Sequence, residues 1–130
     1  MYQRTTHAIR ITVKPSFLEE QSQPEKGYFV WAYTITIENK SGETVTLKTR
    51  YWKIVDAKGK VQEVRGAGVV GEQPTLKPGE RFEYTSGAPL TTPSGFMVGS
   101  YEMETERGQA INVEIPAFSL DSPYGARQVH

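Results

Sequence analysis

The sequence contains no cysteine and only two histidines. The lack of cysteine excludes a disulfide scaffold, cysteine-ligated metal sites and a thiol nucleophile. His7 and His130 lie near opposite ends of the chain, so neither forms a catalytic triad with any motif. Ser86 and Ser94 lie in turn-rich stretches without a nucleophile elbow, which is typical of hydroxyls that form hydrogen bonds within loops. We therefore expect no catalytic residue and a protein that is not an enzyme.

An excess of charge of either sign is also lacking, since fifteen basic and fifteen acidic residues give a formal net charge of zero. Without a basic surface, binding to nucleic acid or to an anionic membrane is not expected. Residues 1–13 contain no apolar run like that of a signal peptide, and no later stretch is long enough to cross a bilayer. These absences predict a cytoplasmic protein that binds neither nucleic acid nor membranes. We also expect it to have no cofactor.

Alternation of apolar and polar residues is the dominant pattern, over short runs bounded by Gly, Pro, Asn and Asp. It is clearest in residues 28–39, where the apolar face comprises Phe29, Trp31, Tyr33, Ile35 and Ile37. No segment has a sustained helical period. The chain is therefore predicted to be all-β, as one domain over residues 1–130. The expected fold is a two-sheet immunoglobulin-like or fibronectin type III-like β-sandwich of about seven or more short strands, with a small closed barrel as the alternative.

Three turns that end at Gly42, Gly59 and Gly108 suit three-residue hairpin loops. Each predicts a register: the first places Ile37 opposite Val45 and Trp31 opposite Tyr51, the second Trp52 opposite Val64, and the third Met103 opposite Ile111 and Tyr101 opposite Val113. The inward face must switch between Tyr51 and Trp52, which predicts a bulge or a change of sheet there.

Four aromatic residues could in principle stack on bases, but without a basic groove we expect them in the core: Trp31, Tyr33, Tyr51 and Trp52. Two polar segments, residues 15–27 and the tail 121–130, lack an apolar pattern that would pack them against the core. We expect both to be flexible.

Gly66, Gly68 and Gly71 have the G-x-G-x-x-G spacing of dinucleotide-binding loops. That motif needs a helix N-terminus after the glycines, whereas Pro74 and Pro78 follow here. We therefore expect the glycines to allow close backbone approach or positive φ. An alternative remains open, in which backbone amides of residues 65–71 form an anion-binding site next to Arg65.

Glu102, Glu104 and Glu106 alternate along one predicted strand, and Glu114 lies across the hairpin from it. Hard divalent cations prefer oxygen ligands. Such neighbouring carboxylates are about 6.6–7 Å apart, too far for two of them to chelate one small ion, and an acidic outer face is ordinary for a half-exposed strand. Glu102, Glu104 and Glu114 are therefore only weak metal candidates, and no metal site is expected.

The chain from Arg50 to Met103, with "GAGVVGEQP", "LKPGE", "YTSG" and "MVGSYEM", resembles the bacterial ApaG family, and the similarity continues through "INVEIPAFSL". The resemblance implies a fibronectin-like sandwich without an established biochemical activity. It also implies kinship with domains of eukaryotic F-box and DNA-polymerase-interacting proteins, to which protein binding is ascribed. By name and gene neighbourhood the family is linked to cobalt and magnesium resistance and to diadenosine tetraphosphate metabolism.

These observations predict a non-enzymatic interaction module that binds a protein partner or a second copy of itself. We expect the interface at a strand edge beside the glycine loop, where Val69 and Val70 are apolar and weakly guarded by charge, although one of the pair could equally pack into the core. The alternative function is a nucleotide-binding or pyrophosphate-binding protein that uses residues 65–71, with hydrolysis of such a ligand as a further option.

Overall fold

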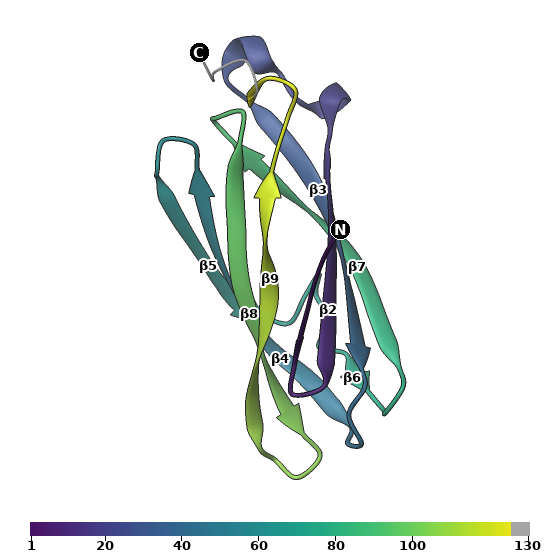
Figure 1. Cartoon of the computed structure of the whole chain (residues 1–130). Helices are drawn as coiled ribbons and strands as arrows, with labels where there is room; N and C mark the ends of the chain where they lie inside the picture. The colour runs from purple at the N-terminus through teal and green to yellow at the C-terminus, as the bar shows by residue number, and fades with distance from the viewer. Residues whose placement is uncertain (126–130) are drawn as a thin grey trace.

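The computed structural model describes residues 1–125, which form antiparallel strands and two single-turn 3₁₀ helices (Figure 1). The strands are β1 (Tyr2–Thr6), β2 (Ile9–Phe17), β3 (Phe29–Asn39), β4 (Val45–Asp56), β5 (Val61–Ala67), β6 (Thr75–Leu76), β7 (Arg81–Leu90), β8 (Gly95–Thr105) and β9 (Ala110–Leu120). The 3₁₀ helices are η1 (Glu19–Gln21) and η2 (Pro24–Lys26). This part of the chain contains no helix with the length and hydrophobicity that a membrane crossing requires.

The strands form two sheets, which confirms the predicted all-β sandwich. One sheet has the order β1-β2-β3-β7, and the other has the order β5-β4-β8-β9 with β6 paired to β4. The alternative of a closed barrel is wrong, because no hydrogen-bonded ladder joins the two sheets within residues 1–125. The inward side chains of both sheets form one core, in which the rings of Tyr33, Trp52 and Phe118 lie 5.4–5.9 Å apart.

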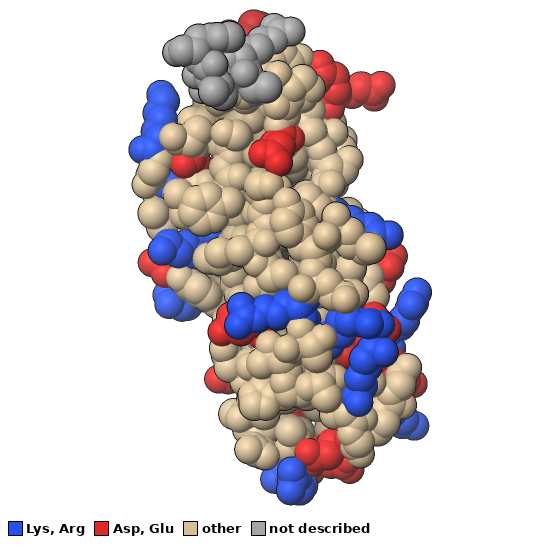
Figure 2. Space-filling view, viewed as in Figure 1, with Lys and Arg blue, Asp and Glu red and all other residues tan. Residues whose placement is uncertain are grey.

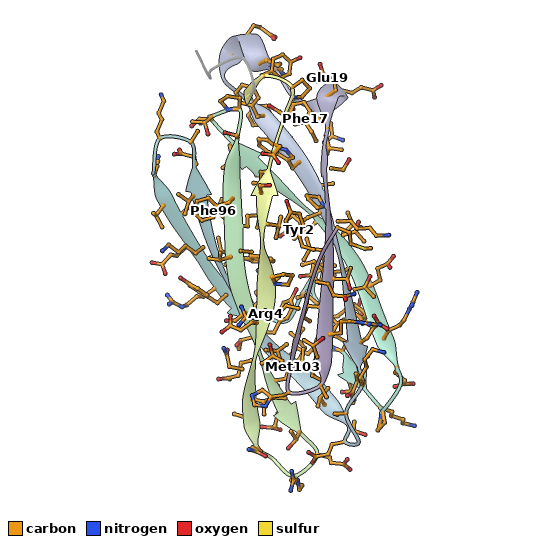
Figure 3. The ribbon with its side chains drawn as sticks, in the orientation of Figure 1. Tyr2, Arg4, Phe17, Glu19, Phe96 and Met103 are labelled. Carbon is orange, nitrogen blue, oxygen red and sulfur yellow. The ribbon has the colours of Figure 1, made fainter. Side chains whose placement is uncertain are left out.

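One side of the sandwich is closed by contact between the edge strands β1 and β9, which lie next to each other in Figure 1. Tyr2 reaches from β1 to β9 (Figure 3), where its hydroxyl lies 2.8 Å from the Ser119 hydroxyl. The backbone N–H of Glu114 donates to the Thr6 hydroxyl over 3.3 Å. The other two edge strands, β5 and β7, lie at opposite margins of the view in Figure 1.

The predicted hairpin around Gly42 is wrong. β3 pairs with β2 and β7, whereas β4 lies in the other sheet, so Ile37 and Val45 are not cross-strand neighbours. The Asn39 side chain directs the chain across, since its Nδ2 donates to the carbonyls of Glu43 (2.7 Å) and Leu76 (2.9 Å). Ile37, Trp31 and Val45, which were predicted to match across a hairpin, instead face a common core from opposite sheets.

The other two predicted hairpins are confirmed. Trp52 lies opposite Val64 in the β4–β5 pair, and Met103 lies opposite Ile111 in the β8–β9 pair. Gly59 and Gly108 end these loops with φ values of +83° and +79°, the left-handed conformation that the sequence predicted.

The switch of inward face in β4 is a bulge, but it lies earlier than predicted, between Leu47 and Thr49. The inward positions after it are Arg50 and Trp52, so Tyr51 points outward. The prediction that Tyr51 belongs to the core is therefore wrong, whereas Trp31, Tyr33 and Trp52 are buried. An extra residue in one strand reverses the alternation for every later residue, which is how Arg50 becomes an inward side chain.

Residues 15–17 extend β2, and most of residues 18–27 form the two 3₁₀ turns. The Ser22 hydroxyl links this segment to the sheet by donating to the Leu18 carbonyl and accepting from the Val30 N–H. The Tyr124 hydroxyl donates to Glu19, which Figure 3 shows at the same end as Phe17. The predicted flexibility of residues 15–27 and 121–125 stays a prediction, and residues 126–130 of the expected flexible tail, including His130, lie outside the described residues.

Candidate functional site: the glycine loop and the cavity beside it

The loop after β5 is a tight two-residue hairpin. Val69 and Glu72 exchange backbone hydrogen bonds of 2.8 and 2.9 Å, and the two residues between them, Val70 and Gly71, have φ values of +43° and +81°. Positive φ at both central positions is the mark of a type I′ turn. The next element is β6, not a helix, so the context that a dinucleotide motif needs is absent, as the two prolines predicted.

Each of the first two glycines makes room for a specific group. A side chain at Gly66 would lie 2.8 Å from a guanidinium nitrogen of Arg50. A side chain at Gly68, which has φ +63°, would lie 2.1 Å from the Glu72 carbonyl oxygen. Gly71 has φ +81° but open space around it. The three glycines of the motif are thus explained by the neighbouring Arg50 guanidinium, by one close backbone approach and by one turn.

Arg50 is the candidate site residue that the sequence analysis missed. Its Nη1 donates to the carbonyls of Ala67 (3.1 Å) and Gly68 (2.9 Å). The half-buried Arg50 side chain therefore binds the start of the loop by two hydrogen bonds. The position of the bulge is the feature that would have identified Arg50. If the inward face switches before Arg50 rather than after Tyr51, Arg50 lies on the inward face.

A cavity of about 160 Å³ lies beside this arginine. It is lined by Tyr33, Arg50, Trp52, Val69, Val70, Tyr84 and Ser86. Tyr101 lies behind it, with its hydroxyl hydrogen-bonded to that of Tyr84. Burial raises the pKa of the Tyr33, Tyr84 and Tyr101 hydroxyls, while the charge of Arg50 acts in the opposite direction. At neutral pH the phenols are therefore uncharged, and they can donate hydrogen bonds.

The predicted anion-binding residues are not brought together in this cavity. Arg65 lies on the outer face of the second sheet, with its guanidinium carbon 4.6 Å from the Tyr51 ring centroid and Nη2 3.9 Å from a Glu63 oxygen. The amides of Gly68 and Val69 already donate to the carbonyls of Lys48 and Glu72. Anion binding by residues 65–71 stays a prediction, but two amides of the loop are occupied.

The two valines have different environments. Val69 is 1% exposed and belongs to the core, which is the alternative that the sequence left open for one of the pair. Val70 is 54% exposed at the tip of the turn and also lines the cavity. Of the two residues predicted for the interaction edge, only Val70 is therefore available to a partner.

The candidate metal ligands point outward from the second sheet. Glu102 and Glu104 are exposed on β8 and lie opposite Asn112 and Ala110, and Glu114 is half-buried on β9, where it accepts a 3.4 Å hydrogen bond from Asn112. Residues 1–125 contain no group of three His, Asp or Glu side chains that could hold a metal ion. Figure 2 shows blue and red side chains interspersed on the visible face, without a large area of one sign.

The hydrogen-bond pattern identifies which residues of β7 have free backbone groups. Lys40 donates to Ala8 and Asn39 donates to Glu80, each over 2.9 Å, so even-numbered residues of β3 bond to β2 and odd-numbered ones bond to β7. In β7 the even-numbered residues are therefore bonded. The residues whose backbone groups point to the unpaired edge are all exposed: Arg81, Glu83, Thr85, Gly87 and Pro89.

The same reasoning applies to β5. The Asp56 N–H donates to Lys60, and the Gly68 N–H donates to Lys48, so the even-numbered residues of β5 bond to β4. The edge of β5 that no strand pairs with comprises Val61, Glu63, Arg65 and Ala67, and the Ala67 carbonyl there accepts from Arg50. Between these two edges lies the cavity beside Arg50, and a second hollow of about 280 Å³ lined in part by Ile54, Gln62 and Leu90.

Comparison with known proteins agrees with this architecture. The family model of the ApaG domain matches residues 19–105. Protein ApaG of Parvibaculum lavamentivorans is 62% identical over 130 residues, which cover 100% of both chains, and Protein ApaG of Rhodospirillum centenum is 66% identical over 125 residues, 96% of each. The crystal structure of an ApaA protein from Bordetella pertussis has a TM-score of 0.87 and 44% identity, and covers 92% of this chain and 97% of that one. The chain belongs to the ApaG family.

Proposed function

We propose that this chain is a non-enzymatic protein-interaction module, which binds an extended segment of a partner protein along the edge of β7 beside the glycine loop. The observation that carries the proposal is the asymmetry of the sandwich. The edges of β1 and β9 cover each other, whereas no strand within residues 1–125 pairs with the free edges of β5 and β7. An extended segment can add to such an edge through main-chain hydrogen bonds.

The middle of β7 is the part of these edges with the fewest charged or proline residues to prevent pairing with another strand. Charged side chains and proline protect natural strand edges, and β7 has Arg81 and Glu83 near one end and Pro89 near the other. Thr85 and Gly87 between them are exposed and uncharged. The free edge of β5 is shorter and carries Glu63 and Arg65 in its centre. The edge at Thr85 and Gly87, together with the tip of the turn at Val70, is therefore the proposed interface.

The proposal also bears on the links that the family resemblance implies. A module that acts through a protein partner would influence cobalt or magnesium resistance and diadenosine tetraphosphate metabolism indirectly, without metal ligands or a catalytic group of its own. The rival function is a nucleotide or pyrophosphate binder at residues 65–71. Titration of the purified protein with adenine nucleotides and with pyrophosphate separates the two, because the interaction module does not require either ligand.

The direct test places lysine at the proposed interface. Val70→Lys replaces an exposed tip, and Gly87→Lys adds a side chain whose Cβ would have only an ordinary 3.6 Å contact with the Trp31 carbonyl, so both variants should fold. Val61→Lys, at an exposed position of β5, is the matched control. We expect capture of a partner from bacterial extract, or self-association measured as mass in solution, to be lost in the first two variants and kept in the control. Unchanged partners and mass in all three would contradict the proposal.

A further inference from the structure

Arg50 is a half-buried cation that lacks an acidic partner. The ion pairs of residues 1–125 are Arg10–Glu38, Arg65–Glu63 and Arg107–Glu43, and none includes Arg50. Two carbonyls accept from its Nη1, while its Nη2 and Nε have no hydrogen-bond acceptor in the described part of the chain. Within residues 1–125 no buried side-chain nitrogen or oxygen lacks a hydrogen-bond partner, so these two unpaired nitrogens remain accessible to solvent, where a ligand can reach them. The arginine therefore has both the charge and the free donors to hold an anion.

The rest of the cavity suits an oxyanion. Its lining contains no carboxylate, and its other polar groups are the hydroxyls of Tyr33, Tyr84 and Ser86. A guanidinium combined with neutral hydroxyl donors is a favourable environment for a carboxylate or a phosphate. Trp52 and Val70 add apolar contacts beside these polar groups.

The size of the cavity decides against a whole nucleotide. Its volume of about 160 Å³ is below the roughly 300–1,000 Å³ typical of sites for drug-sized ligands. A single carboxylate or phosphate group fits this space, whereas a base and ribose do not fit together with it.

We propose that the cavity beside Arg50 binds one carboxylate, supplied by an acidic side chain of the segment that docks on β7. This inference rests on the proposed function and adds the chemistry of the partner. Ser86 lines the cavity. The backbone groups of its neighbours Thr85 and Gly87 point to the free edge of the same strand. A segment paired with this edge therefore runs past the mouth of the cavity, where one of its side chains can reach the guanidinium of Arg50.

The test is a titration that needs no partner. Acetate is added to the ¹⁵N-labelled protein, and the signals of the Arg50 Nε–H and of the amides of residues 67–70 are followed. The informative pair of variants is Val70→Asp and Val70→Asn, because both residues tolerate positive φ and only the first places a competing negative charge at the cavity. We expect saturable shifts in the wild type and in Val70→Asn, and about tenfold weaker binding in Val70→Asp because of like-charge repulsion.

Arg65→Gln, which removes a guanidinium from the outer face, is the control and should bind acetate like the wild type. Acetate binding of equal strength in Val70→Asp and Val70→Asn, or no saturable shift, would overturn the inference. Inorganic phosphate is titrated in parallel, and saturable binding of phosphate without acetate would also overturn it, in favour of a phosphate site. Unchanged partner capture in Val70→Lys and Gly87→Lys together with intact acetate binding contradicts the proposed function, whereas capture that these variants lose, without acetate binding by the wild type, contradicts this inference alone.

Discussion

Gly68→Ala should destabilise the protein far more than Gly71→Ala, although both glycines have positive φ. A left-handed conformation costs an alanine about 1–2 kcal/mol, and this cost applies to both variants. At Gly71 nothing lies within 4 Å of the added Cβ, so no further cost is expected there. At Gly68 the Cβ would lie 2.1 Å from the Glu72 carbonyl oxygen, whereas real Cβ atoms essentially never approach a heavy atom within 3.0 Å. The carbonyl must therefore withdraw.

That movement affects the hydrogen bond of 2.8 Å that the same carbonyl accepts from the Val69 N–H. Loss of a backbone hydrogen bond costs about 0.5–1.5 kcal/mol, and displacement of the buried Val69 adds a packing loss. The total for Gly68→Ala is about 2–4 kcal/mol, roughly twice the cost of Gly71→Ala. Since each kcal/mol corresponds to about 4 °C in a domain of this size, the melting temperatures should differ clearly.

Urea and thermal unfolding of both variants measure these quantities. Equal losses in the two variants would refute the steric argument and leave only the cost of positive φ. A Gly68→Ala protein that melts like the parent but loses a measurable nucleotide affinity would instead establish residues 65–71 as an anion-binding loop.

Three further outcomes are expected. Val70→Asn should raise the free energy of unfolding by about 1 kcal/mol, because a β-branched residue at φ +43° is strained and Asn-Gly is the preferred type I′ pair; calorimetry that shows no gain would contradict this. The raised pKa values of Tyr84 and Tyr101 mean that folding disfavours their ionisation, so stability should be fully present below pH 10.0 and fall above it; Tyr84→Phe should flatten the decline in urea unfolding. Magnesium or cobalt should raise the melting temperature only marginally, and a shift at submillimolar metal that disappears in Glu102→Ala or Glu104→Ala would contradict this.

The sequence was sufficient to predict which residues face the core but not which strands are neighbours. The alternation in residues 29–37 identifies one buried face, because period two is a property of the single strand. Ile37 and Val45 both face inward, and this fact is compatible either with a hairpin or with strands in opposing sheets. The side-chain hydrogen bonds of Asn39 decide between the two, and their partner at Leu76 lies 37 residues away, outside any local pattern.

The candidate site was predictable to a similar extent. The two prolines after the glycines were enough to exclude a helix and to predict a structural role for the loop. The reason for Gly66 was not predictable, since it depends on an arginine in the adjacent strand whose inward orientation is set by a one-residue bulge. A shift of the bulge by a few residues placed Tyr51 on the outer face and Arg50 on the inward face, which is why this arginine was missing from the predicted site.

The conformation of Val70 provides an argument for function that does not depend on the charge of Arg50. A valine with positive φ is disfavoured, and asparagine would satisfy the same turn with less strain. Exposure of its side chain means that it gains little from burial in compensation. What valine supplies and asparagine does not is an apolar rim between the Arg50 cavity and solvent. A strained apolar residue at the mouth of a cavity therefore favours the proposed binding surface, because selection for stability alone would favour asparagine in this turn.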